Sequence, residues 1–399
     1  EQLRGRLPSY HSNSRRQTQP TMAGVRVASD KALMALVVAV LVMCGGGLAA
    51  AASNLVPAVY VFGDSTLDVG MNGPLPLPYG IDLPDESLPT RVSNGFNLAD
   101  YISRELGFEN SPPAYESLKP NTSHQILRGF GGVSYASGGS GILNTTRIMN
   151  NSISLAEQID LFAATKLQMT QYARGKGSVA ALDERLAESL FLISAGGNDF
   201  FRHIQSLCWR PCLPTFRANL LSNFTNHVQT LYGLGARRFG IVGVPPVGCV
   251  PLLRKITLGG GCLDYANNIV REFNTLVAEM MANFSTDPEP HGMTYSVGSA
   301  FNVLMNFTND PVANGFTVVN SACCGDGRFG AGTFCVKNAT VCENRADHLY
   351  WDFAHSTQAT AEKGAAIIFA APVEEGFAAP INFQQLVSPS HGSGGFSSA

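Results

Sequence analysis

Four short polar segments in this chain carry residue types that together could transfer an acyl group. In two of them, Ser65 follows an apolar run in VYVFGDSTLDVG, and Asp352 stands three residues before His355 in YWDFAHST. Acyl transfer needs a hydroxyl nucleophile, a base that takes its proton and a group that holds the imidazole in the right tautomer. Within one turn, Asp352 can reach the Nδ1 edge of His355 and leave Nε2 free for Ser65. The spacing therefore predicts a Ser–His–Asp site.

The other two segments, SYASGGSG at residues 134–141 and ISAGGNDF at residues 193–200, could supply hydrogen-bond donors. Backbone N–H groups of the glycine-rich loop and the side-chain amide of Asn198 suit an oxyanion that develops during the reaction. Taken singly, each segment is weak, because Gly, Asp and Ser also favour plain turns, and GGND could begin a helix with Asn or Asp as its cap. Their joint occurrence, each after an apolar run or before the last helix, favours catalysis.

The elements that must position these residues alternate along the chain. Strands are predicted at residues 58–62, 132–136, 190–195, 239–244 and 294–297, and helices at residues 97–106, 155–173, 215–234, 264–282 and 357–369. Most of the strand segments are continuously apolar, as expected for a parallel sheet covered on both faces, so the pattern predicts a doubly wound α/β fold. Ligands bind beyond the carboxyl ends of such strands, where the strand order reverses. An order 2-1-3-4-5 would therefore gather Ser65, the glycine-rich loop and Asn198.

Composition is consistent with one globular domain. The chain has 399 residues, of which 45% are hydrophobic and 14% charged, and a formal net charge of −3. No basic block indicates a nucleic-acid partner. We assign residues 54–387 to a single hydrolase domain, residues 1–21 to an extraneous N-terminal segment, and the Ser/Gly-rich residues 388–399 to a disordered tail.

Residues 22–52 are typical of a secretory signal peptide. Arg26 and Lys31 precede the apolar run ALMALVVAVLVMCGGGLAAAA, and Ala50 and Ala52 fit an A-x-A cleavage pattern. Glycines interrupt the run before it reaches the roughly 20 residues that a membrane span needs. We therefore expect a secreted, extracellular protein without a stable membrane span.

Cysteine usage agrees with export. Outside the predicted signal the chain has an even set of eight: Cys208, Cys212, Cys249, Cys262, Cys323, Cys324, Cys335 and Cys342. In a secreted chain these indicate disulfides, whose connectivity the sequence leaves open among 105 possibilities. Cys249 and Cys262 bracket a glycine-rich loop and are the preferred pair. Without a C-x-x-C or H-E-x-x-H pattern, no metal site is predicted.

Asparagine sequons are dense. Seven N-x-[ST] motifs begin at Asn121, Asn144, Asn150, Asn223, Asn283, Asn306 and Asn338. In an exported protein this density indicates a glycoprotein that carries these positions on surface loops.

Two other sites that the sequence could encode are disfavoured. An α/β-hydrolase presents its serine in G-x-S-x-G before a long helix, but the chain has no such motif, and Gly70, Gly73 and Pro74 follow Ser65 too closely for a helix. GDGRFG at residues 325–330 matches G-x-G-x-x-G, yet it follows a Cys pair and lacks the flanking strand and helix of a dinucleotide site.

Other histidines are weaker candidates for the base. His203 lies shortly after Asn198, and His348 follows Asp347 directly, but adjacent side chains rarely face each other. His227 falls in a helical-surface pattern and is predicted to be solvated. We therefore assign the base to His355.

The chain resembles the plant GDSL-type esterases/lipases of the SGNH hydrolase superfamily over residues 59–369. The resemblance is carried by FGDSTLDVG, SYASGGSG, GGND and DFAH, with supporting matches in SNGFNLADYI, GVPPVGCVP and CCGDG. It implies a three-layer α/β/α fold with a flavodoxin-like parallel sheet. It also implies an extracellular location in the cell wall or apoplast.

The same blocks imply roles for individual residues. They make Ser65 the nucleophile, Asp352 the acid and His355 the base. Ser65, Gly139 (or a neighbouring glycine) and Asn198 would form the oxyanion hole. Two positions depart from the usual pattern, since Ser134 replaces Asn and Ser356 replaces Pro, but neither removes a reacting group.

The function predicted is that of a secreted carboxylic ester hydrolase working through an acyl-enzyme. The expected substrate is a small-molecule, lipid or cell-wall ester, and the expected state is a monomer. No cofactor is expected, because a general base and oxyanion donors replace a metal. Two alternatives remain: an acyltransferase that passes the same acyl group to an alcohol, and a non-catalytic secreted glycoprotein.

Overall fold

The computed structural model describes residues 54–84, 90–118, 131–206, 210–286 and 292–388. The predicted signal peptide at 22–52, the segment 1–21 and the tail from 389 onward lie outside the described residues. So do Asn121 and Cys208.

A sheet with the strand order β2-β1-β3-β4-β5-β8 forms the centre. Its strands are β1 (Ala58–Gly63), β2 (Gly131–Ser134), β3 (Leu190–Ser194), β4 (Arg238–Val242), β5 (Thr294–Gly298) and β8 (Ala378–Ala379). The first five run parallel in the predicted order, which confirms the flavodoxin-like topology. The prediction missed β8, which pairs antiparallel with β5.

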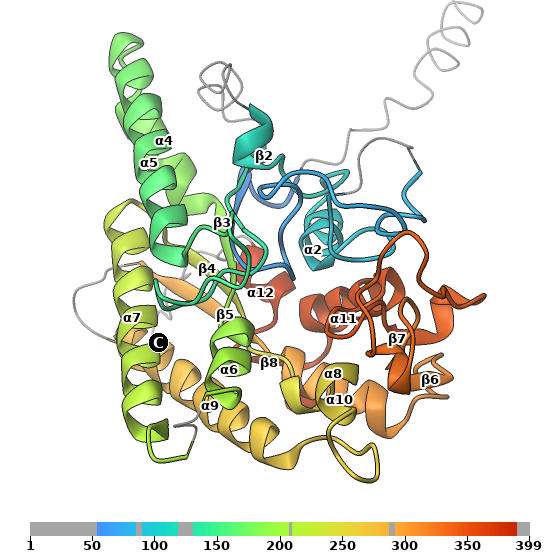
Figure 1. Cartoon of the computed structure of the whole chain (residues 1–399). Coiled ribbons are helices and arrows are strands. Elements are labelled where there is room, and N and C mark those ends of the chain that lie inside the picture. Colours follow the sequence, from blue (N-terminus) through green and yellow to red (C-terminus); the bar gives the residue numbers. More distant parts are fainter. Residues whose placement is uncertain (1–53, 85–89, 119–130, 207–209, 287–291, 389–399) are drawn as a thin grey trace, which may run out of the picture. The chain divides into compact units, whose positions relative to one another are not determined.

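Helices cover both faces of this sheet. The described helices are α2 (Leu98–Glu105), α4 (Leu155–Gly175), α5 (Val179–Glu188), α6 (Gly197–Ile204), α7 (Leu213–Gly233), α8 (Pro251–Arg254), α9 (Asp264–Thr286), α10 (Ala300–Asn309), α11 (Gln358–Ala370) and α12 (Phe383–Val387). Figure 1 shows α4, α5 and α7 on one side of the strands and α2, α11 and α12 on the other. The three-layer α/β/α prediction is therefore confirmed.

The sheet is buried because its strands are apolar on both faces. All six residues of β1 are buried. Across the strands, the Phe62 and Phe191 rings stack at 6.3 Å, and Phe162 of α4 meets the Phe191 ring edge-on at 5.3 Å. This packing holds β1 between β2 and β3 and thereby fixes the point where the chain leaves the sheet.

The predicted helix starts coincide with capping residues. The side chains of Asn97 and Ser154 cap α2 and α4 in complete capping boxes, and Thr357 caps α11. These side chains accept hydrogen bonds from first-turn N–H groups that have no partner within the helix.

A small two-stranded sheet lies outside the main one. It pairs β6 (Val318–Ala322) with β7 (His348–Tyr350) in parallel. The disulfides Cys323–Cys342 and Cys324–Cys335 lie at its end, and the preferred pair Cys249–Cys262 is confirmed. Cys212 is also disulfide-bonded. Within the described residues, none of the helices combines the length and apolar character needed to cross a membrane.

The sequons are not all on loops. Asn144, Asn150 and Asn338 are exposed outside helices and strands. The other described positions, Asn223, Asn283 and Asn306, lie within α7, α9 and α10, so the loop prediction is wrong for these three.

Candidate active site

Ser65 lies just beyond the carboxyl end of β1, at a turn that only glycine can begin. Gly63 has φ of 144°, and a Cβ there would lie 1.9 Å from the carbonyl oxygen of Ser194 on β3. The next N–H, that of Asp64, donates to the same oxygen at 3.1 Å. This close approach of the two strands directs the chain out of the sheet at Ser65.

Ser65, His355 and Asp352 form a continuous hydrogen-bonded chain. Ser65 Oγ lies 2.9 Å from His355 Nε2, and His355 Nδ1 lies 2.9 Å from each carboxylate oxygen of Asp352. The His355 side chain is 24% exposed, whereas that of Asp352 is fully buried. The structure thus brings these predicted residues into the order that nucleophile, base and acid require.

Local backbone geometry holds Asp352 against His355. The N–H groups of Ala354 and His355 donate to Asp352 Oδ1 at 2.9 and 2.8 Å. This Asx-type turn follows β7 and ends where Thr357 caps α11. The three-residue spacing read from the sequence is that of this turn.

Tyr79 is a site residue that the sequence analysis missed. Its hydroxyl donates to Asp352 Oδ2 at 2.7 Å, and its ring meets Trp351 edge-on at 6.4 Å. The ring belongs to a cluster with the buried half-cystines Cys323, Cys324 and Cys335. No periodicity or motif links Tyr79 to a carboxylate 273 residues away.

Asp352 and His355 shift each other's pKa in opposite directions. Burial acts to raise the pKa of Asp352, but the His355 imidazole and the N–H and O–H donors outweigh it, so this pKa lies below its usual value. Burial acts to lower the pKa of His355, but the Asp352 carboxylate outweighs it, so this pKa lies above its usual value. Asp352 is therefore ionised wherever His355 can act as a base.

The three predicted oxyanion donors all have hydrogen-bonding capacity to spare. Among the residues that the structure describes, the N–H groups of Ser65 and Gly139 have no acceptor. Asn198, in the first turn of α6, donates one amide hydrogen to the carbonyl oxygen of Ser140 at 2.8 Å. That bond leaves its second amide hydrogen available. The neighbouring Gly138 is less suited, because its N–H already donates to Asp68 Oδ2 at 2.7 Å.

Two buried acids hold the loops that carry these donors. Besides Gly138, Asp68 accepts hydrogen bonds from the N–H groups of Gly70 and Met71. Asp199 accepts from the backbone of Ile142 at 2.8 Å and of Leu143 at 3.1 Å. Asp68 lies within the motif FGDSTLDVG and Asp199 within GGND. Their place in these motifs was the sign in the sequence that they matter.

Gln158 of α4 clamps the residue that begins the nucleophile turn. Its Oε1 accepts from the N–H of Gly63 at 2.8 Å, and its Nε2 donates to the Gly63 carbonyl oxygen at 2.8 Å. Ser140 Oγ donates to the same carbonyl at 2.8 Å. Nothing in the helical pattern of α4 distinguished Gln158 from an ordinary polar residue.

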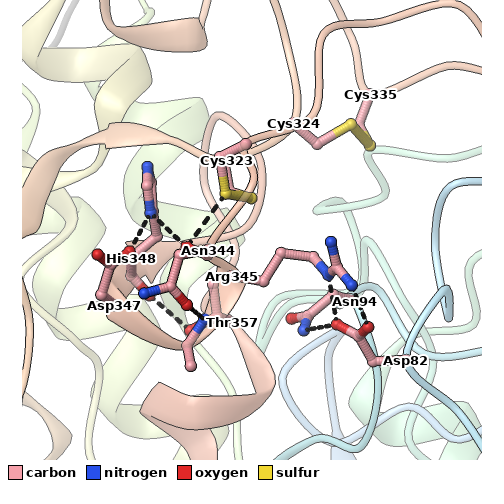
Figure 2. Close-up of a disulfide and its surroundings, with 12 residues drawn as sticks. Asp82, Asn94, Cys323, Cys324, Cys335, Asn344, Arg345, Asp347, His348 and Thr357 are labelled. Atoms are coloured by element: carbon pink, nitrogen blue, oxygen red, sulfur yellow. Dashed lines mark hydrogen bonds and ion pairs between the residues drawn. A yellow bond between two sulfur atoms is a disulfide. The ribbon is translucent and has the colours of Figure 1, made fainter.

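The other histidines that the structure describes, His203, His227 and His348, contact groups other than Ser65. His348 Nδ1 lies 2.8 Å from Asp347 Oδ1, and Figure 2 shows the pair near the Cys323 disulfide. His203 stacks on Phe216 at 4.1 Å. His227 is buried and its Nε2 lies 3.0 Å from the Ile142 carbonyl oxygen, which corrects its predicted solvation: the helix face that carries it is covered.

The two departures from the expected pattern are accommodated. The hydroxyl of Ser134 is buried on β2 without a hydrogen-bond partner among the described residues. The carbonyl oxygen of Ser356 accepts from Ser93 Oγ at 3.2 Å. Neither side chain takes part in the hydrogen bonds that join Ser65, His355 and Asp352.

A pocket opens beside the nucleophile. Ser65 and His355 line it together with apolar side chains from the end of β4, from α10 and from α11. Its enclosed volume is about 100 Å³. A hydroxyl, an imidazole and an apolar cavity thus meet at the carboxyl ends of the parallel strands, where α/β sheets bind ligands.

Comparison with known proteins gives one consistent family. The family model described as GDSL-like Lipase/Acylhydrolase matches residues 59–368. One GDSL esterase/lipase of Arabidopsis thaliana is 32% identical over 338 residues, covering 80% of this chain and 85% of the relative. A second from the same plant is 33% identical over 350 residues, covering 83% and 89%.

Among solved structures, a diltiazem-metabolizing enzyme of a gut microbe matches with a TM-score of 0.30 and 9% identity. The match covers 73% of this chain and less than half, 44%, of that protein, and carries no inference about function. The family model and the Arabidopsis relatives, by contrast, span most of the sequence. This chain therefore belongs to the GDSL-like lipase/acylhydrolase family.

Proposed function

We propose that this carboxylic ester hydrolase works through a covalent acyl-enzyme formed on Ser65. The observation that carries the proposal is the unbroken chain from Ser65 Oγ through His355 to the buried carboxylate of Asp352. Family membership supports ester hydrolysis, and the geometry supports these residues as the reacting set.

In the first step Ser65 Oγ attacks the ester carbonyl carbon while His355 Nε2 takes the hydroxyl proton. The carbonyl oxygen gains negative charge, and the N–H groups of Ser65 and Gly139 and the free amide hydrogen of Asn198 would stabilise it. The carbonyl then re-forms, the C–O bond to the alcohol breaks, and His355 gives its proton to the departing alkoxide.

In the second step a water molecule replaces the alcohol. His355 takes a proton from this water as the oxygen attacks the acyl-enzyme, and then returns a proton to Ser65 Oγ as the carboxylic acid leaves. Asp352 holds the imidazole in one tautomer and stabilises the imidazolium of both steps without being protonated itself.

Purified protein should hydrolyse p-nitrophenyl esters, and both Ser65→Ala and His355→Ala should lower kcat by about three to six orders of magnitude, since triad members act as a unit. A serine-directed phosphonate should label the wild type and not Ser65→Ala. Near-normal turnover by Ser65→Ala would refute the mechanism. Formation of a new ester when an acceptor alcohol is added would identify the acyltransferase alternative.

We propose further that the protein is exported through residues 22–52. The paired cysteines support this, because disulfides persist in oxidising compartments. Expressed from Met22 in a eukaryotic secretory host, the protein should reach the medium with a new N-terminus near Ser53. Retention in the cell with Met22 or the apolar run still attached would contradict export.

A further inference from the structure

The pocket beside Ser65 is apolar and closed toward the core. At its mouth Ser65 and His355 are partly exposed, whereas Val242 of β4 and Ile368 of α11 are only 2% and 1% exposed. Val303 of α10 is a third buried residue of the lining. The cavity therefore runs from the reacting atoms inward and ends against buried side chains.

Charged side chains play no part in recognising the group that this pocket binds. Among the described residues that line the pocket there is no Lys, Arg, Asp or Glu side chain. A charged group placed there would lose its hydration without gaining an ionic partner. The pocket therefore favours a neutral apolar group.

The order of the reaction steps indicates which half of the ester, acyl or alcohol, occupies the pocket. If the reaction proceeds as proposed, the alcohol must leave and water must take its place beside His355, while the acyl group stays bonded to Ser65 through both steps. An inward, apolar pocket suits the half that stays. The alcohol half then lies toward solvent.

The volume limits the length of that acyl group. An enclosed apolar cavity of about 150 Å³ accommodates benzene, and pockets for drug-sized ligands measure roughly 300–1,000 Å³. A cavity of about 100 Å³ is smaller than either. We propose that this pocket binds the acyl group and selects short aliphatic chains, from acetyl to about butyryl.

Gly364 of α11 keeps the pocket open. It is buried, lines the cavity and lies within a helix, where glycine is less favourable than alanine. A Cβ added there would meet only Val303 Cγ1, at an ordinary 3.6 Å, so the surrounding packing alone does not exclude a side chain. We infer that glycine at this position preserves the space for the acyl chain.

The first test measures kcat/KM for p-nitrophenyl acetate, butyrate, hexanoate and decanoate. Each methylene buried in the pocket should raise kcat/KM about fourfold, so butyrate, with two more methylenes than acetate, should exceed it by about sixteenfold. Beyond butyrate the value should decline, by tenfold or more at decanoate. A decanoate value equal to that for butyrate would overturn the length limit and leave the proposed hydrolase intact.

The second test fills the pocket. Gly364→Leu should lower kcat/KM for butyrate by tenfold or more and for acetate by less than about threefold, because only the longer chain needs the occupied space. Gly233→Leu is the matched control: it makes the same change at an exposed helix position with no atom within 4 Å, and should leave the profile unchanged. If Gly364→Leu fails to fold, Gly364→Ala should give the same bias more weakly.

The outcomes separate the two proposals. Equal losses for all chain lengths in a folded Gly364 variant would show that the pocket does not hold the acyl group. If the wild type cleaves no ester and a phosphonate does not label Ser65, the length limit falls together with the proposed function. If Ser65 is labelled and short esters are cleaved, the selectivity of the Gly364 variants alone decides the inference.

Discussion

His355 can act as a base only while its imidazole is neutral, and the groups around it set the pH at which this holds. The Asp352 carboxylate outweighs burial and raises the pKa of His355. As pH falls through that raised pKa the imidazole gains a proton and the base is lost. The activity should therefore decline on the acid side at a pH above the value of about 6.5 for an ordinary histidine.

Tyr79 adjusts this balance through its hydrogen bond to Asp352 Oδ2. In Tyr79→Phe the carboxylate loses one donor, becomes more basic and holds the imidazolium more strongly. The acid limb of kcat/KM should therefore move to higher pH. At the optimum kcat should fall about tenfold, since a hydrogen bond to a charged group contributes about 1.5–3 kcal/mol. The KM for p-nitrophenyl acetate should change little, because Tyr79 does not line the pocket.

The control for this change is Tyr172→Phe, which removes a hydroxyl from an exposed tyrosine on α4. It should leave the pH profile unchanged. A Tyr79→Phe enzyme with an unshifted acid limb would show that Tyr79 serves packing and does not adjust the base.

At the scale of single residues, the sequence identified site residues whose partners lie nearby in the chain or whose residue types are uncommon. Asp352 and His355 stand three apart, and Ser65 ends a strongly apolar run. Tyr79 and Gln158 could not be found in this way. Each acts through a contact that exists only after folding, across 273 and 95 residues of chain.

At the scale of elements, predictions held where a helix or strand carries its own signal. Continuous apolar runs marked the parallel strands, and the amphipathic patterns that predicted α2, α4 and α11 begin at residues that the structure shows capped by Asn97, Ser154 and Thr357. β8 is two residues long, and its pairing with β5 depends on the returning chain and not on local pattern. α6 was foreseen only as an alternative, a helix capped by Asn198 or Asp199, whereas both residues already lie inside the helix and Gly196 precedes its first residue.

The positions of α4 and α6 explain why the glycine-rich loop is held so closely. Gln158 on α4 binds the end of β1, while Asn198 and Asp199 on α6 bind the carbonyl of Ser140 and the N–H groups of the residues that follow. Both helices hold the loop at Ser140, since Gln158 Nε2 also donates to its Oγ at 3.2 Å. Donors held in advance need no reorganisation when the oxyanion forms.

At the scale of the whole molecule, the near-neutral composition conceals an uneven placement of charge. The formal net charge is only −3, yet Asp64, Asp68 and Asp199 are all buried around the proposed site. Burial raises the pKa of each of them. Net charge cannot report this, because it counts ionisable groups without their surroundings. The cost of keeping these acids ionised falls on the stability of the fold.

Asp199 allows that cost to be measured. Burial raises its pKa to about 6 from 3.8, so folding disfavours its ionised form. Its contribution to stability is largest below pH 4 and is lost as pH rises through about 6. Relative to Asp199→Asn, the free energy of unfolding of the wild type should fall by about 2 kcal/mol between pH 4 and pH 7. Urea unfolding of both proteins across this range measures the difference, in which titrations common to both cancel. A difference that stays constant with pH would mean that Asp199 keeps an ordinary pKa and that its N–H donors fully compensate for burial.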